Sequence, residues 1–230
     1  MQILLSLLAV AVAYILGSIP FGLLIVCLRT GKDVRKIESG RTGGTNVLRA
    51  AGFWAGLFTV VLDVSKGILA VWLAKYILPD FYWVHVLSAT SVILGHNYSI
   101  FLPEYDENRK FKRLSGGAGG TPALGAAIGL WGLSSLIILL VGVIFFFTLG
   151  YASIATLSVP TAAMIIFGIK YMVDPFNNPF EYAAFGLIAL LLLGLALRPN
   201  FVKLKNGTER VIPISLHHYL KKKKETDQTN

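Results

Sequence analysis

Long runs of apolar residues alternate along this chain with short polar segments. The runs near 3–28, 51–78, 82–101, 152–172 and 180–197 each approach the roughly 20 residues that an α-helix needs to cross a bilayer. They are continuous, whereas the strands of a membrane β-barrel alternate apolar and polar residues. We therefore expect an all-α polytopic integral membrane protein.

Basic residues predict which polar segments share one side of the membrane. Of the 21 Lys and Arg, 18 lie in three segments, 29–50, 102–119 and 198–230. Basic loops stay cytoplasmic, so these three segments should lie on one face. The run 120–149 fits either one long helix or two short helices that turn at Gly129-Leu130-Trp131-Gly132. One helix would place the basic tail on the opposite face of the membrane, whereas two helices return it to the face of the other basic segments. We therefore predict seven transmembrane helices, some of them short, with the N-terminus outside and the C-terminus cytoplasmic.

Composition narrows the class of protein further. Apolar residues make up 55% of the chain and charged residues 14%, against about 25% charged in soluble domains, which excludes a single soluble domain and disorder. One cysteine, Cys27, excludes a disulfide, and we expect no metal, no cofactor and no nucleic-acid partner. We expect one helical domain over 1–210 and a basic cytoplasmic tail over 211–230, whose Lys221–Lys224 run would bind anionic lipid. The oligomeric state stays open.

The first basic segment has the residue types of a phosphate site. It reads GKDVRKIESGRTGGTNVLRA over 31–50. Glycines let backbone N–H groups turn toward an anion, arginine matches phosphate geometry, and a following helix adds its N-terminal dipole. The alternative is a basic loop that only sets topology, and composition does not decide between the two.

Two other segments carry weaker signals. SGGAGGT at 115–121 fits an anion-binding nest before a helix, or a tight turn with close helix packing. His96 and Asn97 end a span beside the second basic loop, as a ligand pair or as ordinary interfacial residues. Asp63 and Lys66, three apart on one helix, can neutralise each other, although ionisable groups inside a membrane are candidates for function.

Together these segments resemble the bacterial glycerol-3-phosphate acyltransferases that use acyl-phosphate donors, the PlsY family. The resemblance extends along nearly the whole chain. It is carried by Gly17–Gly22, by Ser39–Arg49, by Gly95-His96-Asn97 with Gly116–Gly119, and by Arg198, Asn200 and Gly207-Thr208-Glu209. Asp63 and Lys66 also fit the family's second span.

The resemblance implies transfer of a fatty acyl group from acyl phosphate to the 1-hydroxyl of glycerol 3-phosphate, giving lysophosphatidic acid and phosphate. It implies a multi-pass protein of the bacterial inner membrane with seven helices and a cytoplasmic site. It also implies catalytic roles for Ser39, Arg49 and His96, with Arg49 on a phosphate and Ser39 orienting the hydroxyl or binding phosphate. The implied substrate-binding residues are Arg41, Gly43, Thr45, Asn46, Asn97, Gly116, Gly117, Gly119, Asn200 and Glu209.

Three positions depart from the family pattern. In the segment that matches the family's Gly-Gly-Lys-Gly, this chain has Ala118 at the position of the phosphate-binding lysine. It has Arg41 where the family usually has Asn, and Leu197 where the family usually has a histidine three residues before the tail asparagine. One hypothesis is that Arg41 supplies the missing cation and the enzyme is active. A second is a diverged relative that binds phosphorylated glycerol or lipid and turns over poorly. A third, from another class, is a small-anion transporter, suggested by glycine-interrupted helices and the Asp63/Lys66 pair.

Overall fold

The structure is a computed structural model that describes residues 1–132 and 135–229, with side chains described through residue 223. Its elements, in chain order, are α1 (Gln2–Ser18), α2 (Phe21–Thr30), the 3-10 turn η1 (Val34–Lys36), α3 (Gly44–Ala51), α4 (Phe53–Ile77), α5 (Tyr82–Asn97), β1 (Pro103–Tyr105), β2 (Phe111–Leu114), α6 (Gly120–Trp131), α7 (Ser135–Thr148), α8 (Ala152–Val173), α9 (Phe180–Ala196), α10 (Arg198–Lys205) and α11 (Leu216–Thr229).

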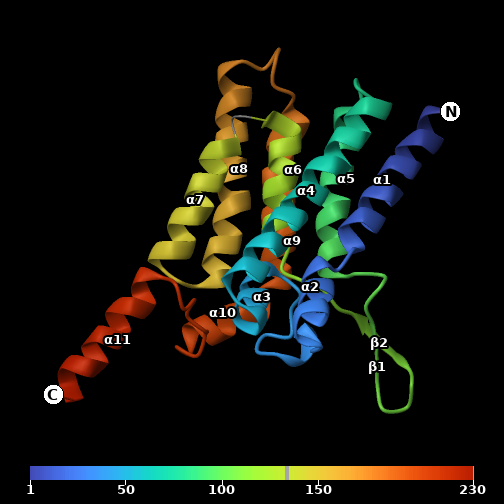
Figure 1. The fold of residues 1–230 in the computed structure, drawn as a ribbon. Helices are drawn as coiled ribbons and strands as arrows, with labels where there is room; N and C mark the ends of the chain where they lie inside the picture. Colours follow the sequence, from blue (N-terminus) through green and yellow to red (C-terminus); the bar gives the residue numbers. More distant parts are fainter. Residues whose placement is uncertain (133–134, 230) are drawn as a thin grey trace.

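The longer helices form a bundle, and the polar elements gather at one end of it. Figure 1 shows α1, α4, α5, α6, α7, α8 and α9 side by side, with α2, α3, α10, α11 and the β1–β2 hairpin at the lower end. The N-terminus lies at the opposite end from α10 and α11 (Figure 1). The three basic segments therefore share one end of the bundle, as their charge predicts.

Within the described residues, three helical segments are long and apolar enough to cross a membrane, namely 2–30, Phe53–Ile77 and Ala152–Val173. A fourth candidate is α9 together with α10, which are bent by 64° at their junction. Large apolar side chains cover the outer surface of the bundle, as lipid-facing side chains do, among them Leu7, Phe58, Ile144 and Leu191. The run 120–149 is two helices, α6 and α7, and residues 133 and 134 of their connection lie outside the described residues.

Two elements differ from the sequence prediction. The first run, predicted as one helix over 3–28, is broken between α1 and α2 at Ile19 and Pro20. Proline has no backbone N–H and its ring clashes with the preceding turn, which accounts for the break. The second basic segment contains the β1–β2 hairpin, which the sequence analysis missed, with Arg109 at positive φ in its turn.

Close packing between helices α4 and α6 helps to hold the elements of the site together. Gly125 of α6 lies against the Val64 carbonyl of α4, where an added Cβ would collide with backbone. Small residues allow this approach. The core around α4, α6, α8 and α9 is filled by larger side chains, including Phe167, Phe185 and Leu193.

Candidate active site

A cavity of about 760 Å³ opens among the polar elements at the lower end of the bundle. One wall consists of loop 35–43, the start of α3, the 115–121 turn and α10. The other wall is apolar and rises between α4, α7 and α8, where Leu57, Val60, Leu139 and Phe146 line it. The cavity therefore joins a polar, cationic end to an apolar arm.

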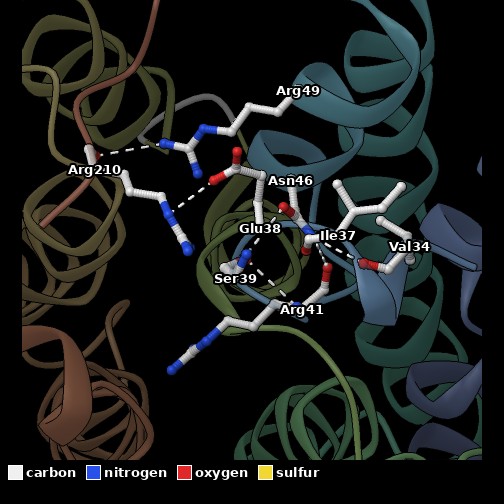
Figure 2. Close-up of polar contacts among 8 residues, drawn as sticks. All are labelled: Val34, Ile37, Glu38, Ser39, Arg41, Asn46, Arg49 and Arg210. Atoms are coloured by element: carbon white, nitrogen blue, oxygen red, sulfur yellow. Dashed lines mark hydrogen bonds and ion pairs between the residues drawn. The ribbon is translucent and has the colours of Figure 1, made fainter.

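Asn46 holds the first loop in shape. Its side-chain NH2 group is buried and lies within hydrogen-bond distance of three backbone carbonyl oxygens, which share its two hydrogens, those of Val34 (3.1 Å), Ile37 (3.0 Å) and Arg41 (2.8 Å). Its carbonyl oxygen accepts the Ser39 N–H at 3.4 Å. These contacts occupy the amide, so Asn46 positions the loop that carries Ser39 and Arg41 (Figure 2).

Arg41 is a half-buried cation with neutral partners. Its Nη2 donates to the Ala196 carbonyl at 2.8 Å and to Asn200 Oδ1 at 3.0 Å, so it reaches the end of α9. Among the described residues no acceptor meets its buried Nη1. Burial lowers the pKa of the Arg41 guanidinium from its ordinary value, and arginine remains charged at neutral pH. A buried cation with a free donor is suited to an anionic ligand.

Arg49 projects from α3 toward the tail of the chain. Its Nη2 donates to the Arg210 carbonyl at 3.4 Å, while Arg210 forms an ion pair with Glu38 at 2.8 Å. Figure 2 shows these three side chains turned toward one another, with Arg41 leaving the loop in a different direction. Partial burial lowers the pKa of Arg49, and the nearby Glu38 carboxylate opposes that shift.

The glycine turn 115–119 packs against two of the other segments. The Gly117 N–H donates to the His96 carbonyl at 2.8 Å, and the Gly116 carbonyl accepts the Thr42 N–H at 3.2 Å. Gly119 has φ +81°, a conformation that favours glycine, and starts α6. The N-termini of α3 and α6 both line the cavity, and the first N–H groups of a helix have no acceptor within it. Two helix N-termini thus face one space, an arrangement that favours anions.

His96 and Asn97 lie on the last turn of α5 and both are buried. His96 contacts the Asp63–Lys66 pair of α4, in which Lys66 Nζ lies 2.7 Å from Asp63 Oδ1. The Oδ1 atom of Asn97 is buried without a hydrogen-bond partner among the described residues. The Asp63–Lys66 pair is therefore not an isolated neutralised pair, because it directly supports a cavity side chain.

The tail closes the cavity through Glu209. One carboxylate oxygen accepts the Ser153 hydroxyl of α8 at 2.8 Å, and the other accepts the Asn200 amide at 3.2 Å. Beyond it, the Ile212 N–H donates to the Gly150 carbonyl at 2.7 Å, which fixes the chain to the α7–α8 turn. The beginning of the segment predicted as a basic tail over 211–230 is therefore held against the bundle.

All thirteen site residues proposed from the sequence line this one cavity. They are Ser39, Arg41, Gly43, Thr45, Asn46, Arg49, His96, Asn97, Gly116, Gly117, Gly119, Asn200 and Glu209. The altered positions Ala118 and Leu197 line it too. The sequence analysis missed Lys203, which also lines the cavity and follows Asn200 by three residues on α10, a spacing that places both on one helix side. It also missed Arg35 and Arg210, for which the sequence offers only the general basic charge.

Comparison with known proteins identifies the family of this chain. The sequence profile described as glycerol-3-phosphate acyltransferase matches residues 7–207. A glycerol-3-phosphate acyltransferase of Myxococcus xanthus (strain DK1622) is 34% identical over 87% of this chain and 96% of its own length. One of Geotalea daltonii is 35% identical over 86% of this chain and 93% of its own length.

Solved structures are similar in fold as well. The crystal structure of PlsY (YgiH), an integral membrane glycerol 3-phosphate acyltransferase, in its glycerol 3-phosphate form superposes with a TM-score of 0.74. The alignment has 28% identity and covers 90% of this chain and 94% of that one. The lysophosphatidic acid form gives a TM-score of 0.71 at 27% identity. By its sequence along nearly the whole length and by its fold, this chain belongs to the glycerol-3-phosphate acyltransferase family.

Proposed function

We propose that this chain transfers a fatty acyl group from acyl phosphate to the 1-hydroxyl of glycerol 3-phosphate. The observation that carries the proposal is the cavity itself, in which a cationic wall with two helix N-termini continues into an apolar arm. Both reactants carry phosphate, and one also carries a long alkyl chain. Family membership supports glycerol 3-phosphate as acceptor, and the shape of the cavity supports a lipid-like donor.

The reaction needs positioning more than a strong nucleophile on the protein. The glycerol oxygen forms a bond to the acyl carbon, and the bond between that carbon and the phosphate oxygen breaks. The hydroxyl proton leaves with the inorganic phosphate. Acyl phosphate is already activated, so holding both reactants and stabilising negative charge can provide most of the acceleration.

The residues divide between the two reactants by position. Arg49 and the N-terminus of α3 would hold one phosphate, with Ser39 oriented by Asn46 to contact the hydroxyl or the phosphate. The glycine turn and Arg41 would hold the second. The apolar arm between α4, α7 and α8 would keep the acyl chain in contact with the bundle. Asn97, with its unpartnered oxygen, and Asn200, joined to Arg41, complete the polar wall.

Arg41 is the residue we propose as the substitute for the family lysine at Ala118. It lines the same cavity as the 116–119 turn, and its buried Nη1 meets no acceptor in the part of the chain that the structure describes. Its anchoring contacts are to the end of α9, where Leu197 replaces the family histidine. A charge gained in the first loop would thus serve the region where two polar side chains are lost.

We also propose seven spans, with the site on the cytoplasmic face of the bacterial inner membrane. The helices α5, α6 and α7 are short, so local bilayer thinning would accompany their insertion. The positions of the termini at opposite ends of the bundle support an N-terminus outside (Figure 1). The lysines near residue 221 would bind anionic lipid on the cytoplasmic face.

The decisive experiment measures phosphate release by purified protein given acyl phosphate and glycerol 3-phosphate, with acyl-CoA as the control donor. We expect release that depends on both reactants and a lysophosphatidic acid product. Acyl-CoA would release CoA and no phosphate, so with that donor the lysophosphatidic acid product is measured instead, and its formation from acyl-CoA without acyl phosphate would refute the proposed donor. Binding of both reactants without turnover would identify a diverged binder.

Two variants test the Arg41 substitution. Arg41→Ala should lower kcat/KM by about 100-fold, the scale of one lost charged donor to a transition state. Ala118→Lys in the same background should restore part of the loss. Lys36→Ala, an exposed basic residue outside the cavity, is the matched control. Full activity of Arg41→Ala would exclude compensation.

A further inference from the structure

Three polar atoms surround the ammonium group of Lys66, one in an ion pair and two at hydrogen-bond distance. Its Nζ lies 2.7 Å from Asp63 Oδ1, 2.9 Å from His96 Nδ1 and 3.1 Å from the Ile19 carbonyl oxygen. An ammonium group carries three hydrogens and has no lone pair. The third acceptor exists because the chain is broken at Pro20, which keeps the Ile19 carbonyl out of a continuous helix.

This arrangement decides which nitrogen of His96 carries hydrogen. A nitrogen that accepts from Lys66 cannot itself be protonated, so Nδ1 is bare and the hydrogen of the neutral ring is on Nε2. The opposite tautomer would need Nδ1–H to donate to Asp63 Oδ1, but that distance is 3.5 Å, beyond the usual 2.7–3.2 Å of such bonds. A neutral Lys66 would also leave the Asp63 carboxylate uncompensated inside the bundle, which is costly.

The other ring nitrogen faces the cavity at the glycine turn. A Cβ added to Gly117 would collide with His96 Nε2, so glycine at this position is what brings the turn up to that atom. The ring is buried and cannot turn freely, because Asp63 and Lys66 lie behind it and the turn lies in front.

We infer that Asp63 and Lys66 are positioning residues that fix His96 as a neutral Nε2–H donor, aimed at an oxygen of the phosphorylated reactant held at the 116–119 turn. In this role His96 donates a hydrogen bond and does not remove the hydroxyl proton. The inference rests on the proposed function for the identity of that reactant, and the tautomer itself is independent of it.

Nitrogen NMR of the full-length protein in detergent micelles reads the tautomer directly. With histidine labelled by ¹⁵N, the His96 signals are those lost in His96→Gln. At neutral pH we expect Nε2 to show one-bond coupling to hydrogen and Nδ1 to show none. Hydrogen on Nδ1, or on both nitrogens, overturns the inference. Because this measurement needs no turnover, an inactive preparation would refute the proposed reaction and still decide the tautomer.

Steady-state kinetics then show whether His96 acts as a hydrogen-bond donor or as a general base. The amide nitrogen of glutamine can replace an Nε2–H donor but cannot accept a proton, so His96→Gln should keep activity within about 10-fold of wild type. His96→Ala should lose about 100-fold or more in kcat. Equal loss in the two variants would indicate a proton acceptor and overturn the inference.

A double-mutant cycle tests Asp63 and Lys66. Removing one partner would leave an unpaired buried charge, so Asp63→Asn and Lys66→Met are made together. We expect a folded protein with a mixed His96 tautomer and kcat lowered by about 10-fold or more, since the wrong tautomer presents a lone pair where a donor is needed. In the His96→Gln background the same pair should change kcat little further. Additive losses in a protein that keeps the Nε2–H tautomer would show a purely structural role.

Discussion

The backbone N–H of Thr42 donates to the carbonyl oxygen of Gly116 at 3.2 Å and joins the two glycine-rich segments of the chain. On its other side Thr42 lies against Gly22 of α2, where an added Cβ would collide with the Thr42 carbonyl. The contact places the N-termini of α3 and α6 on one cavity. Arg49, on α3, therefore faces the same space as the glycine turn.

Arg49 should bind the phosphate of glycerol 3-phosphate by charge and by its planar fork. Arg49→Ala should lower kcat/KM by about 100-fold or more, and Arg49→Lys should recover only part of it, because an ammonium lacks the bidentate geometry. Steady-state kinetics over glycerol 3-phosphate concentration check this, with Lys36→Ala as the control. Wild-type kinetics in Arg49→Ala would show that Arg49 does not bind the phosphate of glycerol 3-phosphate.

The stability of the bundle should depend on having glycine at position 125. Gly125→Leu places a side chain against the Val64 carbonyl, so α4 and α6 must separate, and overpacking of this kind costs about 1–3 kcal/mol. Thermal unfolding in detergent should show a clear decrease in Tm. Gly168→Leu on α8, where no atom of the described residues lies within 4 Å of the added Cβ, should leave Tm almost unchanged. Equal Tm values for the two variants would contradict this packing.

Much of this arrangement follows from the sequence, and the exceptions have physical causes. The run lengths predict the helices, and the turn at Gly129–Gly132 predicts the separation of α6 from α7. The site residues could be named because the short segments in which glycine, arginine and asparagine cluster resemble the motifs of the acyltransferase family, whereas composition alone left a plain basic loop as an equal alternative. The link from Lys66 to His96 could not be found in the same way. It depends on how α4 and α5 rotate against each other, and periodicity does not fix that rotation.

The missed hairpin gives a prediction about pH. Arg113 Nε donates to Glu104 Oε2 at 2.6 Å across the two strands, and this contact lowers the pKa of the Glu104 carboxyl. A lowered pKa in the folded state means that the pair's stabilisation is present above the carboxyl's ordinary pKa of 4.5 and is lost as pH falls through the folded value. The pair is partly exposed, so the effect should stay below about 1 kcal/mol.

Hydrogen exchange of the hairpin amides, corrected for intrinsic rates, measures this effect. Protection in the wild type should decrease between neutral and acidic pH by more than in Glu104→Gln, which has no carboxyl to titrate. An equal decrease in both proteins would show that the pair does not stabilise the hairpin.

The length of the acyl chain should be set by the apolar arm of the cavity. Gly142 of α7 lines that arm, and an added Cβ would lie 3.2 Å from Val159 Cγ2. Gly142→Leu should therefore shorten the arm, raising KM for long acyl phosphates more than for short ones, because the last methylene groups lose about 0.8 kcal/mol of burial each. Rates for a series of acyl phosphates of increasing length check the prediction. Gly168→Leu, away from the cavity, should leave the order of preference unchanged, and a uniform loss across the series in Gly142→Leu would place the acyl chain elsewhere.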